Sequence, residues 1–489
     1  MTLRLYNTLS RSLDEFEPLE PGKVLVYGCG PTIYDYPHIG NFRTFIAFDL
    51  LHRYLEWSGY EVKFVTNLTD VDDKTIKGAS EKGITIGEYT APFGEAFLED
   101  ARSLGIRPMD LYPKATDYVD GMVEFVGRLE AKGLAYQADD GSVYFSISAF
   151  PEYGRLSRVD PEAVRPGVRV SMDEYAKEDV RDFALWKAAK PEDEKAGAAW
   201  DSPWGRGRPG WHLECSVMSI AELGETLDIH LGGEDLIFPH HEDEIAQSEG
   251  ATGKTFVRYW LHIKHLRLEG QKMSKSIGNT VSVGELITRG YDPAAIRHQL
   301  LSAQYRRELN FTMEGLDGSS RAVQRLLDFE TRLTECPVAD EAQETRIPEL
   351  AQAGLERFRE AMNDDLNSAE ALGALFVFLN EVNAELDRVG SRIQAGDRKV
   401  GVETLGSMDE VLGLLELARE ARAVDDTTEE WIEEQIRLRE EARKARDFAD
   451  ADAIRDALAD RGVVLEDSAE GTRWKVVQRA VRSAETDDR

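Results

Sequence analysis

Three things are scarce in this 489-residue chain, and each scarcity excludes a class of protein. Only three cysteines are present, which is too few for a disulfide scaffold and typical of a reducing compartment. No apolar run reaches the about 18 residues that predict a membrane span, and the first residues lack a signal-peptide pattern. We therefore expect a cytoplasmic protein with no membrane segment. Its length predicts two to four domains.

Lysine is also scarce, because it supplies only 18 of the 59 cationic side chains. There are 91 acidic residues, and the net charge is −32. Such diffuse acidity with little lysine suggests adaptation to high salt, where self-repulsion is screened. A nucleic-acid partner would require a local basic patch within this acidic surface.

A glycine-rich turn joins a predicted buried strand at 24–27 to a predicted helix at 42–51. Free N–H groups and the helix dipole make such a junction a phosphate-binding site. The turn also carries a thiol, Cys29, and an imidazole, His38. In this context Cys29 is either a functional group or an inert core residue.

A second predicted strand, 61–67, gives the chain the strand–helix–strand order of an α/β fold with a parallel sheet. Polar residues follow it at 68–74, where open α/β sheets bind ligands. Asp70, Asp72 and Asp73 in this stretch either bind a cation or cap the next helix. Both alternatives stay open at this point.

Residues 95–205 have a different character, and we interpret them as an insertion between two halves of the parallel sheet. Residues 84–130 look helical, 139–160 predict a turn and a strand, and 157–200 are charged with weak periodicity. The stretch 200–216 that follows is rich in tryptophan and glycine, which predicts a pocket wall. We expect a helix to begin at Cys215.

Four side chains of zinc-ligand type follow three predicted strand ends. A strand at 227–231 precedes His240 and Glu244, which lie four residues apart and share one helical face. With Cys29 and Cys215 they make two thiols, one imidazole and one carboxylate. The alternatives are an ordinary helix pair and two core thiols. The spacing is not the H-E-x-x-H of zinc proteases, which disfavours hydrolysis.

A predicted mobile loop carries Lys272 and Lys275 between Gly270 and Gly278. Two ammonium groups on a hinged loop can neutralise the charge that develops on a polyphosphate. Two lysines on a surface loop are common, but fewer are expected in a chain with so little lysine.

The C-terminal third is predicted to be helical. We expect a bundle from 321 to about 425, with a capping box that begins at Asn367 and an acidic, poorly ordered piece near 337–347. A second helical unit begins at Glu429. One face of this unit is predicted to carry Phe448, Ala451, Ile454 and Leu458.

The same unit carries cations suited to a tRNA anticodon stem, and Trp474 offers a stacking surface. The cations are Arg443, Lys444, Arg446, Arg473 and Lys475. The alternative is a solvated amphipathic hairpin.

Taken together, these segments resemble the cysteinyl-tRNA synthetases, which are class I aminoacyl-tRNA synthetases. Residues 37–41 are similar to the HIGH motif, and 272–276 repeat KMSKS letter for letter. Residues 210–215 and 232–244 are similar to the family's zinc segments, and 443–474 to its C-terminal domain. One departure is Asn41, which stands where the motif name has a second His; its amide can still donate to phosphate.

The resemblance implies a Rossmann-like catalytic domain at 1–264 with the 95–205 insertion. It also implies a KMSKS and stem-contact region at 265–320, a helical bundle at 321–425 and an anticodon-recognition domain at 426–489. The implied enzyme activates L-cysteine with ATP, expels pyrophosphate, and transfers cysteine to the 3′-terminal ribose of tRNA(Cys). Mg²⁺ is expected with ATP, no membrane is involved, and the chain is expected to be a monomer.

Roles for single residues follow from the same resemblance. The catalytic residues would be His38, Asn41, Lys272 and Lys275. ATP would contact those four together with Pro31, Thr32 and Gly40. Cysteine would contact Thr69, Trp211 and Asp235. One zinc ion would be held by Cys29, Cys215, His240 and Glu244.

The zinc ion that the resemblance implies would explain how cysteine is distinguished from serine, because an apolar pocket rejects so close an isostere by only ~1–3 kcal/mol. Zinc binds a thiolate far better than an alcohol. Four protein ligands ordinarily close a zinc site, so the substrate sulfur must add a fifth ligand or displace a weak one, for which Glu244 is the candidate.

Two rivals remain: a ligase that joins cysteine to an amino sugar, and a non-catalytic paralogue that binds zinc and tRNA. The amino-sugar ligase would not need residues 321–489, so the length of the chain favours a tRNA substrate. The presence of Lys272 and Lys275 argues against the non-catalytic paralogue.

Overall fold

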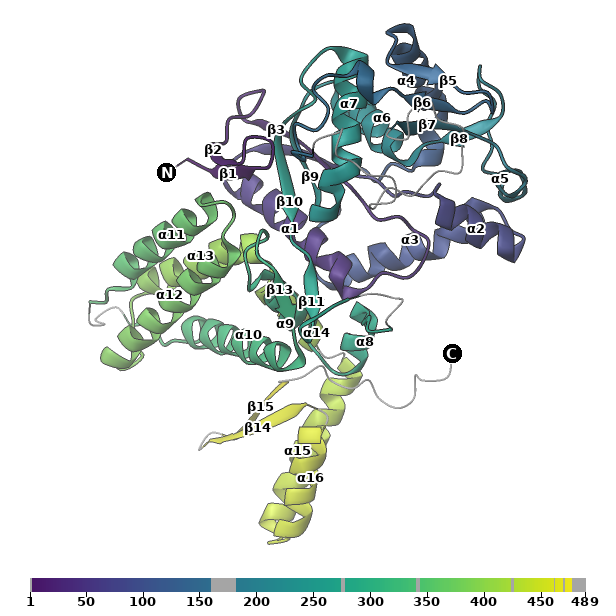
Figure 1. Cartoon of the computed structure of the whole chain (residues 1–489). Helices are drawn as coiled ribbons and strands as arrows, with labels where there is room; N and C mark the ends of the chain where they lie inside the picture. Colours follow the sequence, from purple (N-terminus) through teal and green to yellow (C-terminus); the bar gives the residue numbers. More distant parts are fainter. Residues whose placement is uncertain are drawn as a thin grey trace.

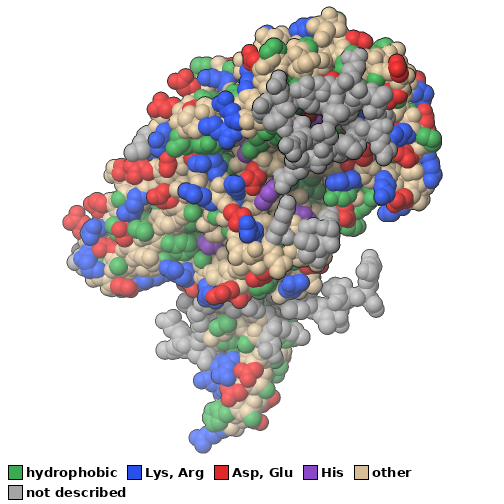
Figure 2. Space-filling model, in the orientation of Figure 1, with side chains coloured by type: hydrophobic (Ala, Val, Ile, Leu, Met, Phe, Trp, Pro, Cys, Tyr) green, Lys and Arg blue, Asp and Glu red, His purple; other side chains and the backbone are tan. Residues whose placement is uncertain are grey.

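The computed structural model describes residues 2–159, 182–273, 278–339, 344–423, 426–460, 462–468 and 471–476. In Figure 1 a parallel sheet and its helices form the upper body, a helical bundle lies below it, and two C-terminal helices project from the base. The surface in Figure 2 mixes acidic and basic side chains and gathers neither sign in one area. No helix in the described ranges has the length and apolar character needed to cross a membrane.

The centre of the upper body is a four-stranded parallel sheet with the order β10-β9-β3-β4. Its strands are β3 (Lys23–Gly28), β4 (Glu61–Thr66), β9 (Leu227–Gly233) and β10 (Val257–Ile263). The chain builds β3 and β4 towards one edge and later adds β9 on the other side of β3. The strand order therefore reverses between β3 and β9, and ligands bind in the crevice at such a switch point. This confirms the predicted α/β fold with a parallel sheet.

Two helices that pack against this sheet overlap helices that the sequence predicted. The predicted helix at 42–51 lies within α1 (Ile39–Trp57), which packs Phe42 and Phe48 into the core. The prediction that a helix begins at Cys215 was wrong, because α6 (Trp211–Leu223) starts four residues earlier. Gly210 precedes it in an extended conformation, and a Cβ there would stand 1.9 Å from the carbonyl oxygen of Ala184.

A second, antiparallel sheet lies between the two halves of the parallel sheet in sequence. It has the order β5-β6-β7-β8, made of β5 (Ala135–Gln137), β6 (Val143–Phe145), β7 (Phe183–Ala188) and β8 (Gly207–Pro209). Strand β7 was not predicted, because the residues around it are charged and show weak periodicity. The sheet nevertheless buries its six residues almost completely. Residues 160–181, part of the same charged stretch, lie outside the described ranges.

Among the described residues, four α-helices accompany this region, and the second and third of them fall where the sequence predicted a helical stretch at 84–130. They are α2 (Asp73–Lys82), α3 (Ile86–Ser103), α4 (Val119–Ala131) and α5 (Pro191–Ala196). Irregular chain separates α3 from α4, so only part of 84–130 is helical.

A small three-stranded sheet connects the upper body to the bundle. Strand β11 (Leu266–Leu268) pairs with β12 (Gln271–Lys272) on one side and in parallel with β13 (Leu309–Phe311) on the other. Helices α8 (Val283–Thr288) and α9 (Pro293–Leu301) lie between these strands in sequence. At the N-terminus, β1 (Arg4–Asn7) and β2 (Ser12–Glu15) form a separate hairpin.

The bundle begins at Met313, eight residues before the predicted start. It comprises α10 (Met313–Thr334), α11 (Ile347–Asn363), α12 (Ser368–Arg388), α13 (Ala395–Leu412) and α14 (Leu415–Arg422). The predicted cap at Asn367 is present, because its side chain accepts the N–H of Glu370. Of the predicted acidic piece near 337–347, residues 340–343 lie outside the described ranges.

The C-terminal unit pairs α15 (Asp426–Lys444) with α16 (Phe448–Asp460) and adds a hairpin of β14 (Val463–Ser468) and β15 (Gly471–Val476). Ile432, Leu458 and Val463 form its small core, with Trp474 packed against them. The predicted apolar face was wrong for Phe448, which is 63% exposed. The hairpin was not predicted.

Candidate metal centre and active site

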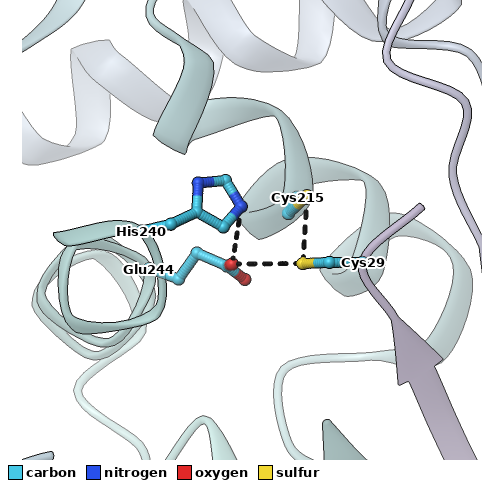
Figure 3. Close-up of side chains that lie close together, drawn as sticks. All are labelled: Cys29, Cys215, His240 and Glu244. Carbon is cyan, nitrogen blue, oxygen red and sulfur yellow. Dashed lines mark hydrogen bonds and ion pairs between the residues drawn. The ribbon is translucent and has the colours of Figure 1, made fainter. Parts of the chain in front are cut away.

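The four predicted metal ligands meet at the carboxyl ends of β3 and β9 (Figure 3). Cys29 directly follows β3, and Cys215 lies in the first turns of α6. His240 belongs to a π-helical turn (Ile237–His241), and Glu244 to the first turn of α7 (Glu242–Thr252). One ligand atom from each residue lies within 4.8 Å of all the others, and all four residues are buried.

The separations between these ligand atoms match those around one ion. The two Sγ atoms are 3.7 Å apart, Cys29 Sγ lies 3.7 Å from Glu244 Oε1, and that oxygen lies 3.1 Å from His240 Nε2. Ligand atoms about 2.0–2.3 Å from a tetrahedral zinc stand roughly 3.3–3.8 Å from each other. Soft sulfur and nitrogen donors also suit zinc. The residues therefore fit a metal ion of this kind.

A second donor set overlaps the first, and the sequence did not reveal it. His230 Nε2 and His241 Nε2 lie 3.4 and 3.3 Å from Cys29 Sγ, and both approach the Glu244 carboxylate. Together with Cys29 and Glu244 they form an alternative group of four. The available signal was a histidine inside the buried strand β9 and a second one beside His240.

Further polar groups form hydrogen bonds with the histidines of this cluster. His241 Nδ1 lies 2.8 Å from His262 Nε2, and His262 Nδ1 lies 2.7 Å from the Thr8 hydroxyl. On the other side, His212 Nδ1 lies 3.0 Å from His240 Nδ1. Such outer partners fix the orientation of ligand imidazoles. Five of the nine histidines in the chain thus gather around the cluster: His230, His240, His241 and His262 are buried, and His212 is partly buried.

Burial dominates the electrostatics of the cluster. It raises the pKa of Glu244 well above its ordinary value and lowers the pKa of His240. Within the thiol pair, a hydrogen bond from Cys29 lowers the pKa of Cys215 to about 5, whereas burial raises that of Cys29. A thiolate is the form that binds metal, so Cys215 is prepared as a ligand.

One carboxylate oxygen of the cluster also supports a bound metal ion. Glu244 Oε2 is buried and has no hydrogen-bond partner among the described residues, and the same holds for Nδ1 of His230. Buried polar atoms are normally satisfied, and each exception calls for an explanation. A cation at the centre of the cluster would provide a partner for the carboxylate.

The glycine-rich turn beside the cluster is held by Asn67, a residue that the sequence did not single out. Asn67 Oδ1 accepts the N–H of Gly30 at 2.9 Å, and its Nδ2 donates to the Thr69 hydroxyl at 2.9 Å. A Cβ on Gly30 would stand 1.6 Å from the Asn67 carbonyl oxygen, so only glycine fits there. Asn67 therefore fixes both the turn and one predicted cysteine contact.

The predicted ATP contacts of this turn lie in one continuous stretch. The Pro31 carbonyl accepts the N–H of Thr69 at 3.1 Å, and Thr32 forms a parallel bridge with Thr69. These bonds join the end of β3 to the end of β4, which places the turn over the sheet's carboxyl edge.

His38 and Asn41 occupy the N-terminus of α1. His38 is the N-cap residue, and its N–H donates to Asn41 Oδ1 at 3.0 Å. Asn41 thus performs a helix-capping task with its carbonyl oxygen, which leaves its role toward phosphate a prediction. Gly40 lies against the His38 ring and 3.5 Å, measured from its Cβ position, from the Met273 sulfur.

The two lysines are only partly visible in the structure. The backbone of Lys272 belongs to β12, but its side chain and all of residues 274–277, including Lys275, lie outside what the structure describes. Their roles stay predictions.

Two predicted cysteine contacts, Trp211 and Asp235, differ in their surroundings. Trp211 stacks on His240 with ring centroids 4.3 Å apart, which makes it a wall beside the ligands. Asp235 is more than half exposed and lies 3.7 Å from His265 Nε2.

The acidic stretch at 68–74 serves local structure. Asp72 caps α2 through the Lys74 N–H, Asp70 accepts from Thr116, and Asp73 pairs with Arg208. Among the described residues these carboxylates form no group that could hold a metal. The capping alternative is therefore correct for Asp72.

Comparison with known proteins identifies three matching families along the chain. Residues 15–321 match the tRNA synthetases class I (C) catalytic domain. Residues 357–416 match the DALR domain, and residues 426–474 match the cysteinyl-tRNA ligase anticodon binding domain. The first of these alone covers more than half of the chain.

Full-length relatives agree with these matches. The chain is 45% identical to a cysteine–tRNA ligase of Koribacter versatilis, covering 97% of this chain and 100% of that protein. It is 46% identical to one of Symbiobacterium thermophilum, with the same coverage. A third, from Thermococcus onnurineus, is 45% identical over 97% of this chain and 99% of the relative.

A solved structure supports the fold alone. Mycobacterium tuberculosis methionyl-tRNA synthetase in complex with methionyl-adenylate superposes with a TM-score of 0.58 at 17% identity. The match covers 81% of this chain and 91% of that one. The three family models and the full-length relatives show that the chain belongs to the cysteine–tRNA ligase family of class I aminoacyl-tRNA synthetases.

Proposed function

We propose that this chain joins L-cysteine to tRNA(Cys) in two steps, activation with ATP and transfer to the terminal ribose, and that a zinc ion recognises the cysteine sulfur. The observation that supports this most directly is the buried group of Cys29, Cys215, His240 and Glu244. It lies at the switch point of the parallel sheet, next to a turn of the kind that binds phosphate.

Activation joins the cysteine carboxylate to the α-phosphate and expels pyrophosphate. Because the protein forms no covalent bond in this step, its contribution is positioning and charge stabilisation. The start of α1 and the His38 side chain would bind the α-phosphate region. Lys272 and Lys275 would neutralise the departing pyrophosphate, with Mg²⁺ bound to ATP.

The four ligands would hold zinc, which supplies a Lewis acid that prefers a thiolate to an alcohol. Cys215, whose pKa is lowered by the hydrogen bond from Cys29, would bind the ion as a thiolate. Glu244 uses only one oxygen toward His240 and Cys29, so it is the ligand best placed to yield to an incoming sulfur. His212 and His262 keep the neighbouring imidazoles in fixed orientations.

Three further residues would hold the rest of the substrate. Trp211 forms the wall over His240, Thr69 contacts the carboxylate end, and Asp235 binds the ammonium group. The exposed position of Asp235 suits a residue that meets an entering substrate.

The C-terminal residues would bind tRNA. The cations at the end of α15 (Arg443, Lys444 and Arg446) are exposed, whereas Trp474 is partly buried against the core of this unit. We keep the domain limits 1–264 with its 95–205 insertion, 265–320, 321–425 and 426–489 as part of this proposal. A monomeric state and a cytoplasmic location also stay predictions.

The test is ATP–pyrophosphate exchange with cysteine and with serine, followed by charging of a tRNA(Cys) transcript. We expect exchange with cysteine, none measurable with serine, charging of the tRNA, and about one zinc per chain. Exchange without charging would indicate the amino-sugar ligase instead. The absence of exchange by zinc-loaded protein would indicate a non-catalytic paralogue and overturn the proposal.

A further inference from the structure

One buried cation in the upper body has no carboxylate beside it. Arg43 lies on α1, two residues after Asn41, and is only 3% exposed. Within the described ranges no carboxylate lies within ion-pair distance of it, unlike the buried Arg297 and its partner Asp49. Burying a charge without a counter-ion is costly unless hydrogen bonds replace water.

Backbone carbonyls accept hydrogen bonds from both terminal nitrogens of the Arg43 guanidinium, whereas its Nε has no partner among the described residues. It donates to the carbonyl oxygens of Leu300, Ala303 at 2.9 Å, Gln304 at 2.8 Å and Arg307 at 3.4 Å. These acceptors lie at the C-terminus of α9 and in the turn after it, where carbonyls lack helical partners and the helix dipole is negative. Burial lowers the pKa of Arg43 to about 10, so the group stays charged at neutral pH.

The segment that Arg43 holds, residues 300–307, leads directly into β13. Strand β13 pairs in parallel with β11, and the tight turn from β11 to β12 is tied to β13 as well. Gly270 N–H donates to Asn310 Oδ1 at 2.7 Å, and Glu269 N–H donates to the Phe311 carbonyl at 3.0 Å. The position of the β11–β12 hairpin therefore follows the position of residues 300–307.

The same hairpin touches the N-terminus of α1. The Met273 sulfur, just beyond β12, lies so close to Gly40 that a Cβ added to this glycine would stand 3.5 Å from it. On the far side of the loop, the Val281 carbonyl accepts the N–H of Ile39 at 2.8 Å. The N-terminus of α1 and the chain on either side of the KMSKS loop thus pack against each other. A shift of one relative to the other changes this contact.

A second residue, in the helical bundle, forms hydrogen bonds with the same segment, residues 300–307. Asp365, 1% exposed, accepts hydrogen bonds from the Gln304 amide at 3.0 Å and from the Tyr305 hydroxyl at 2.5 Å. Its Oδ2 also accepts from Arg306 Nε at 2.5 Å. The segment 300–307 is therefore fixed by α1 on one side and by the bundle on the other.

We infer that Arg43 is a positioning residue, which sets the distance between the N-terminus of α1 and the β11–β12 hairpin through the carbonyls of residues 300–307. It acts without touching substrate. The inference rests on the proposed function only for its kinetic consequence. Misplacement of reacting groups by about 1 Å can reduce a rate by about 100-fold.

The chain offers a matched control in Arg297. This residue is also fully buried and also binds α1, through Asp49. Its other bonds go to the carbonyls of Leu412, Leu104 and Gly105, away from β11 and β13. Loss of either guanidinium should therefore destabilise the fold, but only Arg43 should affect the hairpin.

The experiment compares Arg43→Lys with Arg297→Lys in the full chain. Lys keeps the charge but lacks the planar fork that spans several acceptors. We expect Arg43→Lys to lower kcat for ATP–pyrophosphate exchange about 10- to 100-fold, with the KM for cysteine and the zinc content within about twofold of wild type. Arg297→Lys should keep kcat within about threefold at temperatures where both variants are folded.

Hydrogen exchange supplies a readout that does not depend on activity. Peptides covering 264–273 and 308–313 should exchange faster in Arg43→Lys than in wild type or Arg297→Lys. Equal exchange in all three proteins, or equal loss of kcat in both variants, would overturn the inference. If wild type itself shows no pyrophosphate exchange, the proposed function fails, whereas hydrogen exchange still decides the role of Arg43.

Discussion

The metal cluster and the C-terminal unit use polar residues in opposite ways. At the cluster, thiols, imidazoles and a carboxylate are buried beside one another, so their presence requires a ligand or a hydrogen-bond network to offset desolvation. In the C-terminal unit, Arg443 and Lys444 are exposed on α15, and a small apolar core holds the fold. Buried polar groups therefore indicate function more strongly than exposed charges do. Substitutions in the metal cluster should therefore impair cysteine activation, whereas substitutions in the C-terminal unit should impair tRNA binding.

The largest effect is expected for Cys29→Ala. Both possible donor sets contain Cys29, so its loss removes a ligand whichever set binds the ion. We expect stoichiometric zinc to be lost and kcat/KM for pyrophosphate exchange to fall at least about 1,000-fold, since the remaining catalysis depends on positioning alone. Metal analysis after dialysis and exchange kinetics measure both.

The control for this substitution is Cys336→Ala. Cys336 is also buried, but it lies in the bundle region with its thiol on the Ser391 carbonyl. It should keep zinc and exchange activity. Full zinc content in Cys29→Ala would show that the buried cluster does not bind zinc, and would contradict the contrast drawn between the cluster and the C-terminal unit.

The next effect distinguishes the two donor sets. Cys215→Ser removes a ligand of the set with His240, whereas His230→Asn removes one of the alternative set. We expect Cys215→Ser to weaken zinc binding by more than about 100-fold and to reduce the preference for cysteine over serine. Loss of a supporting imidazole should weaken zinc binding by about 10- to 100-fold at most. Competition with a metal chelator measures both affinities, and the reverse order would assign the ion to the alternative set.

A smaller and different effect is expected for Leu458→Ala in the C-terminal unit. Leu458 is completely buried in that unit's core, so its truncation should cost about 2–5 kcal/mol of local stability. We expect the KM for tRNA in charging to rise several-fold, while pyrophosphate exchange and zinc content stay unchanged. The exposed Phe448 provides the control, because Phe448→Ala removes little packing. A fall in exchange activity would show that the two regions are not separable.

The smallest effect concerns a partly buried histidine outside the metal cluster. His298 on α9 lies 2.9 Å from the Ser319 hydroxyl, and burial lowers its pKa to about 4. An unfolded histidine has a pKa of about 6.5, so the unfolded chain takes up a proton first as the pH falls, and stability is lost between about pH 6.5 and 4.

The loss that His298 contributes between pH 7 and pH 5 should be about 2 kcal/mol. His298→Asn should reduce the pH dependence of unfolding in urea by that amount, whereas Ser319→Ala should keep it, since the imidazole remains. An unchanged dependence in His298→Asn would show that His298 is not held neutral in the fold.

Much of the fold was predictable because its signals are local. The buried strands at 24–27 and 227–231 and the cap at Asn367 depend on residues within a few positions of one another. Strand β7 was missed, since its burial comes from partners at 143–145 and 207–209. The start of α6 was misplaced, because close contact with Ala184 at Gly210 is not visible in the sequence.

The amino-acid sequence by itself determined the family, the parallel-sheet class and the four candidate ligands, because residue type and short spacing express strand, turn and donor chemistry. Only the tertiary structure brought His230, His241 and Asn67 to the same place and paired Arg43 with the carbonyls after α9. The physical reason is that these contacts join segments up to about 260 residues apart, whose meeting depends on how whole strands and helices pack.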